Sequence, residues 1–186
     1  IKKNIDLIVI GVSSKGIEWV GEQLSKFYNE KTKILLLTKG LAVIENQFET
    51  LADKLEKILN KNGTANPKIS AVGGPCLASG LANRIKSSVV LASKNIEIVK
   101  EIGKIISTSY YSTEFTEDLI GVEVCAATKN IYSMLIGASE GLSGNNIDGE
   151  IKKKYYLNTA ASLIYKSLSE MKKFTKKLKG KEETVF

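Results

Sequence analysis

Apolar and polar residues follow one another along this chain in blocks that predict strands and helices in turn. Residues 5–12 form a nearly continuous apolar run, typical of a strand buried on both faces of a sheet. Apolar positions then recur at helical spacing over residues 17–27, and a short apolar run follows at 34–37. Helical spacing returns over residues 44–58, and Gly63 ends that predicted helix.

The same alternation continues to about residue 115. The stretches "KISAVGG" and "SSVVLAS" predict two strands, and "PCLASGLAN" between them predicts one or two helical turns. A third helix is predicted over 98–106, and "YYSTEF" predicts a last short strand. Alternating strands and helices of this kind imply an α/β fold with a doubly wound (Rossmann-type), mostly parallel sheet. We therefore expect residues 1–115 to form the second half of such a domain, with its first half upstream.

The pattern changes at about residue 116. Two long helical segments are predicted, at 118–140 and 147–178, and the joint "GLSGNNIDG" lies between them. No strand pattern follows, so residues 116–186 are expected to be the first part of an all-helical domain.

The amino-acid composition excludes several kinds of catalytic and metal site. At 43% hydrophobic and 25% charged residues the chain is typical of a globular protein, and it has no histidine. The absence of histidine excludes serine triads and histidine metal sites, and two cysteines are too few for a zinc cluster, so no metal is expected. No uninterrupted run of eighteen apolar residues occurs, and "IKKNIDLIVIGVSS" lacks a cleavage pattern. We expect a cytoplasmic protein without a membrane span.

The net charge of +7 raises the question of nucleic acid. Arg84 is the only arginine, although arginine is the usual reader of bases and phosphates, and the lysines gather mostly in the last predicted helix. A solvated helix face explains the charge better than nucleic-acid binding. An anionic small molecule also suits a positive surface.

Candidate binding loops stand at the predicted strand ends, where α/β sheets bind ligands. They are residues 11–14, 38–40 and 73–76, which are small or carry hydroxyls, and Lys39 stands in the second. Such loops also serve simply as tight turns, and a lysine after a strand is common.

The stretch "GVEVCAATKNIYSMLIG", residues 121–137, predicts a buried helix with Lys129 and Asn130 at its centre. The small residues Cys125 and Ala126 lie one turn before Lys129, which leaves open space beside the ammonium group. Three explanations fit this pattern: Lys129 reaches out to water, pairs with a distant carboxylate, or does chemistry on a bound molecule.

Four stretches, in order and spacing, resemble the NAD(P)-dependent glycerol-3-phosphate dehydrogenase family: "LLLTKGL", "GGPCLASGLA", "TEDLIGVEVCAATKNIYSMLIGASEGL" and "LSEMKKF" through "KGKEETVF". The resemblance covers nearly the whole chain, and its most specific part is Gly-x-Glu-x-x-x-Ala-x-Lys-Asn. It implies an oxidoreductase that interconverts dihydroxyacetone phosphate and glycerol 3-phosphate with NAD or NADP, acting on a small phosphorylated substrate. The apolar stripes of the helical part also permit a homodimer.

The resemblance assigns roles to matching positions. It implies that Lys129 is the catalytic proton donor and acceptor, and that Lys39 is a second catalytic lysine contacting substrate and cofactor. The remaining implied contacts are Gly74, Cys76 and Asn130 with the substrate, and Val12, Ser13, Ser14 and Ala78 with the cofactor.

The chain departs from the family pattern at several places. Cys76 stands where serine, threonine or asparagine is common, Gly80 replaces a usual glutamate, and Ser13 a usual proline. The fingerprint Gly-x-Gly-x-x-Gly does not occur, and the family's later aspartate and Arg-Asn segment is not in these 186 residues. Two alternatives therefore stay open: a non-catalytic binding subunit, or a related two-domain reductase acting on another small oxo or hydroxy acid, such as ketopantoate or hydroxyisobutyrate.

Overall fold

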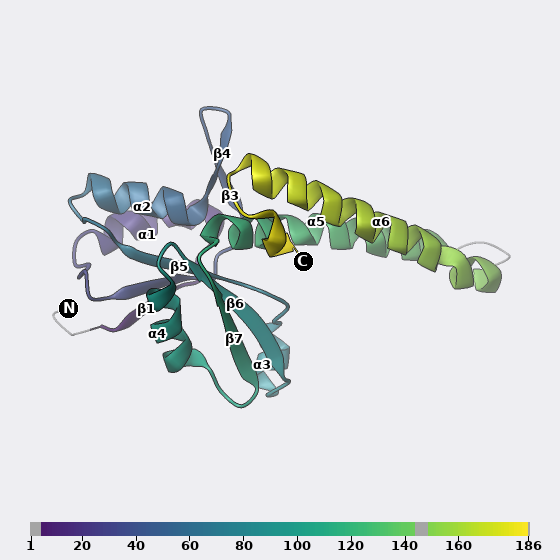
Figure 1. Cartoon of the computed structure of the whole chain (residues 1–186), viewed down its shortest axis with the longest axis horizontal. Helices are drawn as coiled ribbons and strands as arrows, with labels where there is room; N and C mark the ends of the chain where they lie inside the picture. The colour runs from purple at the N-terminus through teal and green to yellow at the C-terminus, as the bar shows by residue number, and fades with distance from the viewer. Residues whose placement is uncertain (1–4, 144–148, 186) are drawn as a thin grey trace.

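The computed structural model describes residues 5–143 and 149–185, and its centre is a five-stranded sheet (Figure 1). In spatial order the strands are β1 (Leu7–Ile10), β2 (Lys33–Leu36), β5 (Lys68–Gly73), β6 (Ser87–Ser93) and β7 (Tyr111–Thr116). Every neighbouring pair is parallel except β5 and β6. The predicted mostly parallel α/β sheet is thus confirmed.

Helices cover both faces of this sheet. α1 (Ile17–Leu24) and α2 (Leu51–Lys61) lie on one face and α4 (Ile96–Ile106) on the other, whereas the short α3 (Ala78–Ala82) has no buried residue. β2 shows the two-sided burial most clearly: Ile34 and Leu36 belong to the core formed with α1 and α2, whereas Leu35 belongs to the core formed with α4. Side chains that alternate along a strand point to opposite faces, so a continuous apolar run is what such a strand requires.

The first strand is less buried than its sequence predicts. β1 spans Leu7–Ile10, shorter than the expected 5–12, and in the described chain it pairs only with β2. Val9 is 50% exposed as a result. The expectation of burial on both faces is therefore wrong for β1, because no element of the described chain covers that part of the sheet edge.

The predicted helix over 44–58 is only partly correct. Its first part is a two-stranded hairpin, β3 (Leu41–Ile44) and β4 (Gln47–Thr50), and the helix α2 begins at Leu51. Glu45 and Asn46 both have positive φ, which is the backbone of a tight two-residue hairpin turn. Thr50 then caps α2 by accepting a hydrogen bond from the backbone N–H of Asp53.

After β7 the chain forms a helical arm, as predicted. α5 (Leu119–Ser143) and α6 (Gly149–Lys177) run antiparallel and extend away from the sheet, and the short 3-10 helix η2 (Glu182–Val185) returns to the start of α5 (Figure 1). Most of the predicted joint between them, residues 144–148, lies outside the described residues.

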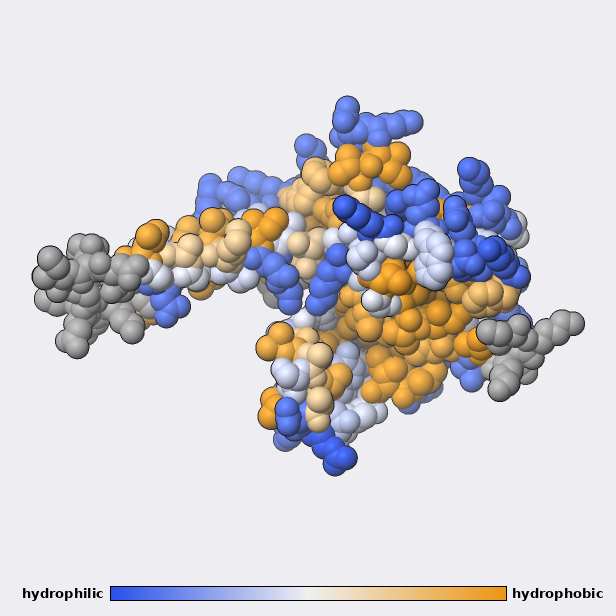
Figure 2. All heavy atoms as spheres, turned by 180° about the vertical axis from the view of Figure 1, so that it is seen from behind, coloured by the Kyte–Doolittle hydropathy of each residue, from blue (hydrophilic) through white to orange (hydrophobic). Residues whose placement is uncertain are grey.

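The expectation that residues 121–137 are buried holds only for their first part. α5 is buried where it meets the sheet, but its outer part is exposed from about Ile131 onward. Apolar side chains gather along the arm in Figure 2. The large apolar residues exposed on the two arm helices are Ile131, Met134, Leu135, Leu142, Leu157, Ile164 and Tyr165. The exposed part carries Ile131, Met134 and Leu135 and is at least as apolar as the buried part, so the sequence pattern does not separate the two.

Within the described residues, α5 is the single helix whose length and composition over Leu119–Leu142 would suffice to cross a membrane. Core helices of soluble proteins meet the same criterion, and 39% of the apolar window is buried in this protein. Leu119 and Val122 belong to the core that α1 and α2 share with the sheet, which places the first part of α5 in the protein interior.

Candidate active site

The carboxyl ends of β1, β2 and β5 meet at one edge of the sheet, because these three strands are parallel. The Thr38 hydroxyl donates a hydrogen bond of 2.7 Å to the carbonyl oxygen of Val12, which joins the loops that follow β1 and β2. Gly40 has φ +137°, and a Cβ there would lie 3.3 Å from the Cβ of Ser14. The structure thus brings residues 12–14 beside the loop that carries Lys39.

The loop after β5 runs close over its neighbour. Gly74 has φ +134°, and a Cβ at this position would lie 3.0 Å from the Cα of Val89 and 3.1 Å from the carbonyl oxygen of Ser88. Only glycine fits this backbone without strain. The path of the loop that carries Cys76 is therefore fixed by the approach of Gly74 to β6.

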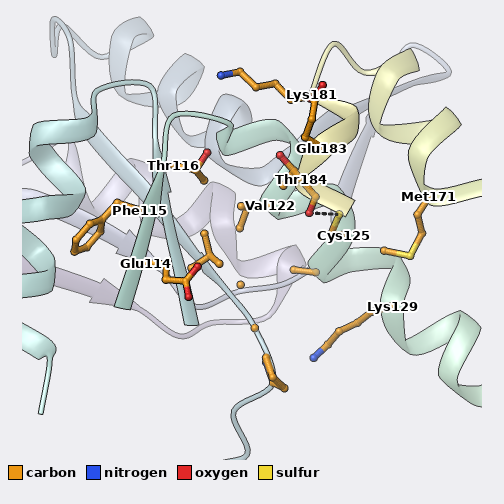
Figure 3. Close-up of a pocket in the computed structure, with 15 residues that line it drawn as sticks. Glu114, Phe115, Thr116, Val122, Cys125, Lys129, Met171, Lys181, Glu183 and Thr184 are labelled. Carbon is orange, nitrogen blue, oxygen red and sulfur yellow. Dashed lines mark hydrogen bonds between the residues drawn. The ribbon is translucent and has the colours of Figure 1, made fainter. Parts of the chain in front are cut away.

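Helix α5 lies directly against β5, and this contact positions Lys129. A Cβ on Gly73 would stand 2.8 Å from Cγ1 of Val122, so the glycine allows the close approach of helix and strand. Val122, Cys125, Ala126 and Lys129 line one cavity, which is the helical face expected from their spacing. The small residues one turn before Lys129 leave open space, and the Lys129 side chain extends into it (Figure 3).

This cavity has a volume of about 540 Å³ and lies between the ends of β5 and β7, α5 and the C-terminal segment. Of the residues predicted for the site, Gly74 and Lys129 line it directly. The other lining residues are Gly73, Pro75, Val90, Glu114, Phe115, Thr116, Val122, Cys125, Ala126, Met171, Lys181, Glu183 and Thr184.

The wall from the C-terminal segment is held by Asp118, which sequence reasoning missed. The Asp118 carboxylate is 5% exposed and accepts hydrogen bonds from the backbone N–H of Gly121 at 3.0 Å and of Lys181 at 2.9 Å, and from the Thr184 hydroxyl. The Cys125 thiol lies 3.9 Å from the Thr184 carbonyl oxygen, as Figure 3 shows. These contacts join residues about sixty positions apart, and no local pattern in the sequence indicates them.

The two predicted lysines, Lys39 and Lys129, lie near enough for their charges to interact. Burial, followed by the positive charge of Lys129, lowers the pKa of Lys39 from its ordinary value, whereas Cys76 acts in the opposite direction. The two ammonium groups are thus near enough to repel each other. Two cations beside a cavity favour an anionic ligand, or negative charge that develops on a ligand during reaction.

Seven predicted site residues are not among those that line the cavity: Val12, Ser13, Ser14, Lys39, Cys76, Ala78 and Asn130. Asn130 is exposed on α5, Ala78 is exposed at the start of α3, and the half-buried Cys76 follows the lining residues Gly74 and Pro75. Residues 12–14 lie at the same sheet edge, beside Lys39 rather than in the cavity wall.

A buried carboxylate on α5 was also not singled out from the sequence. Glu123 is 5% exposed, and its two oxygens accept hydrogen bonds of 3.2 and 3.3 Å from the backbone N–H of Ala52, in the first turn of α2. Burial raises the pKa of Glu123 to about 8, against the lowering effect of hydrogen bonds at Ala52, Thr50 and Leu51. At neutral pH the protonated form is therefore well populated.

The raised pKa of Glu123 predicts how stability depends on pH. Below pH 4.5, the ordinary value, the group is protonated in both the folded and unfolded states, and its stabilising contribution is complete. As the pH rises from there to about 8 the unfolded chain loses the proton first, so the free energy of unfolding falls. Denaturant titrations across this range should show that the wild type loses up to about 5 kcal/mol more than Glu123→Gln, which has no titrating group. Parallel pH curves for the two proteins would contradict the shift.

The fold and the position of Lys129 together indicate the class of protein to which the chain belongs. A doubly wound α/β sheet whose last strand leads into a helical arm, with a lysine of that arm facing the strand ends, defines a two-part α/β protein with a cavity where the two parts meet. Two family models match the chain: NAD-dependent glycerol-3-phosphate dehydrogenase N-terminus over residues 2–99, and the C-terminus of the same family over residues 118–186. The chain belongs to the NAD-dependent glycerol-3-phosphate dehydrogenase family.

Individual relatives agree with this assignment. The chain is 28% identical over 184 residues to glycerol-3-phosphate dehydrogenase [NAD(P)+] of Clostridium botulinum, covering 99% of this chain and 50% of the relative. It is 26% identical to the NADP(+)-dependent glycerol-3-phosphate dehydrogenase of Archaeoglobus fulgidus, covering 99% and 52%. A crystal structure of the glycerol-3-phosphate dehydrogenase of Coxiella burnetii superposes with a TM-score of 0.76 at 27% identity, covering 96% of this chain and 49% of that one. The chain thus spans about half the length of the curated relatives it matches.

Proposed function

We propose that this chain is the central part of an enzyme that interconverts dihydroxyacetone phosphate and glycerol 3-phosphate with NAD(P) as the cofactor. The observation that carries the proposal is the position of Lys129, which extends from α5 into the cavity at the strand ends, with Lys39 close enough to feel its charge. Membership of the dehydrogenase family supports the same reaction.

The residues at the sheet edge fit one end of a dinucleotide. Gly11 has open space where a side chain would stand, Ser13 is exposed, and Lys39 supplies a cation at the same edge. Residues 12–14 and Ala78 are proposed to contact the cofactor, which supplies the hydride to the carbonyl carbon when it is bound.

Lys129 is proposed to donate and accept the proton of the reaction. As the ketone is reduced, negative charge grows on the carbonyl oxygen, and a positioned ammonium group stabilises that charge and donates a proton from Nζ to the oxygen. In the reverse direction the neutral amine accepts the proton from the hydroxyl group. Lys39 is proposed to add a second positive charge beside the same oxygen, and Gly74, Cys76 and Asn130 to contact the rest of the substrate.

The proposal also assigns a role to each part of the chain. Residues 1–115 supply half of the cofactor-binding domain, and residues 116–186 supply the first part of the domain that carries Lys129. The cavity lies between these two parts, as its lining residues on β5, β7 and α5 show.

The direct test is an assay of the full-length protein. We expect it to oxidise NADH or NADPH in the presence of dihydroxyacetone phosphate, with little turnover of ketopantoate and little oxidation of hydroxyisobutyrate by NAD or NADP. A protein that binds NADH but does not oxidise it with any of these compounds would be a non-catalytic binding subunit. Preferential turnover of another oxo acid would replace the proposed substrate while keeping the reaction class.

A further inference from the structure

The carboxyl group of Glu123 joins α5, which carries Lys129, to the first turn of α2, which the hairpin β3–β4 connects to the loop of Lys39. It lies on α5, six residues before Lys129, and binds the backbone N–H of Ala52 at the beginning of α2. The first turn of a helix has unpaired N–H groups and a partial positive charge, so it binds an oxygen acceptor well. Thr50 already serves the N–H of Asp53, which leaves the N–H of Ala52 for Glu123.

The first turn of α2 is in turn connected to Lys39. The hairpin β3–β4 follows Lys39 directly, and its antiparallel register pairs Leu41 with Thr50. The hairpin therefore brings the chain back so that the start of α2 lies beside the backbone of residues 39–41. A Cβ on Gly40 would lie 4.0 Å from Cδ1 of Leu51, the first residue of α2. A shift of this helix end would move Lys39 with it.

Helix α5 links Glu123 to Lys129. Lys129 is six residues after Glu123, which is about one and two-thirds turns of an α-helix. This spacing places Lys129 about 9 Å beyond Glu123 along the axis and on a different face of the helix. Glu123 can thus bind α2 while Lys129 points into the cavity, as the structure shows. Because an α-helix is rigid over this distance, the bond at Ala52 fixes where Lys129 stands relative to Lys39.

If Glu123 served only to fill space between α5 and α2, a carboxyl group would not be needed at this position. Glu123 is 5% exposed, and an apolar side chain of similar size would fill that space without the cost of burying a carboxyl group. A carboxyl group gives a directional bond to one N–H, which apolar packing does not.

We propose that Glu123 is a positioning residue, which sets the separation of Lys129 and Lys39 by binding α5 to the first turn of α2. The catalytic side of this inference rests on the proposed function, whereas the geometric side does not.

The test compares three variants of the full-length protein. Glu123→Ala removes the acceptor, Glu123→Gln keeps an acceptor oxygen at the same length, and Val124→Ala removes fully buried apolar volume from the adjacent position of α5, outside the cavity wall. The first readout is the pH dependence of acylation of Lys39, followed by mass spectrometry, with the exposed Lys31 as an internal reference. The second is kcat and KM with dihydroxyacetone phosphate.

We expect Glu123→Ala to raise the pKa of Lys39 towards its ordinary value, because Lys129 moves away, and to lower kcat about 10- to 100-fold with a smaller change in KM. Glu123→Gln should restore both readouts to near the wild-type values. Val124→Ala should lower the melting temperature and leave both readouts unchanged. An unchanged titration of Lys39 in Glu123→Ala, or equal losses in Glu123→Ala and Val124→Ala, would overturn the proposal.

A variant that does not fold and a wild type without turnover have different consequences for the proposal. If Glu123→Ala does not fold, Glu123→Asp replaces it, because the shorter side chain must draw α5 towards α2 or lose the bond, and either should shift the titration of Lys39. If the wild type shows no turnover, the proposed function fails, while the titration of Lys39 still decides whether Glu123 fixes the two lysines.

Discussion

Replacement of Lys129 by methionine should lower kcat/KM for dihydroxyacetone phosphate by about 10³-fold in the full-length protein. Methionine fills much of the same volume but has neither the positive charge nor the proton, so the developing oxyanion loses its stabilisation. The affinity for NAD(P)H should change little, because Lys129 lines the cavity from α5, whereas residues 12–14 are not among the residues that line it. Steady-state kinetics measure kcat/KM, and a cofactor titration measures the affinity for NAD(P)H.

A matched control is available on the arm. Lys177 is an exposed lysine of α6, so Lys177→Met makes the same chemical change away from the cavity and should leave kcat/KM unaltered. Near-normal turnover of Lys129→Met would refute the assigned role. A large loss of cofactor affinity would instead show that Lys129 serves binding of the dinucleotide.

Replacement of Lys39 by methionine should lower kcat/KM about 10²-fold, and should raise KM as well as lower kcat. Lys39 lies at the sheet edge, where burial and then the charge of Lys129 lower its pKa. Its loss removes one of two cations that attract the anionic substrate, so binding suffers together with the rate. Kinetics over a range of substrate concentrations separate the two effects.

Lys39→Arg tests whether charge or proton transfer matters at this position. Arginine keeps the positive charge but does not release its proton, so KM should return towards the wild-type value if Lys39 acts by charge. If Lys39→Arg is as inactive as Lys39→Met with an unchanged KM, then Lys39 takes part in proton transfer and its role as a fixed charge is wrong.

The strength of the hydrophobic pattern explains which parts of the fold were predictable. β2 is an apolar run because Ile34 and Leu35 must face opposite cores, and the α4 region shows helical spacing because only one of its faces meets the sheet. Such periods follow directly from the geometry of strands and helices. Element order and the mostly parallel sheet could therefore be derived before the structure.

The hairpin β3–β4 shows where the pattern fails. Ile44 and Phe48 stand four residues apart and fit a helix, yet each lies on a separate strand of a largely exposed hairpin. Phe48 packs edge-on against Phe174 of α6, with ring centroids 5.4 Å apart, and this contact was not visible in the local sequence. A coincidence of spacing cannot be told from a helix when the true partner is more than a hundred residues away.

The candidate site divides in the same way. Lys129 with its small neighbours, and Lys39 after a strand, were recognisable because residue type and spacing are local properties. The wall held by Asp118, and the bond from Glu123 to α2, were not, because each depends on contacts between segments more than sixty residues apart. Family resemblance supplied roles for single residues, but it did not show which of them share a cavity.

The sequence by itself determined the α/β class, the order of most elements and the start of the helical arm, and it singled out Lys129 and Lys39 as candidates for chemistry. The tertiary structure decided that these lysines lie near enough for their charges to interact, that the C-terminal segment closes one wall of the cavity, and that a buried carboxyl group joins α5 to the first turn of α2. The reason is physical: periodicity and residue type act within a few turns of the chain, whereas a site is made by distances between segments, and those distances are fixed only when the core packs.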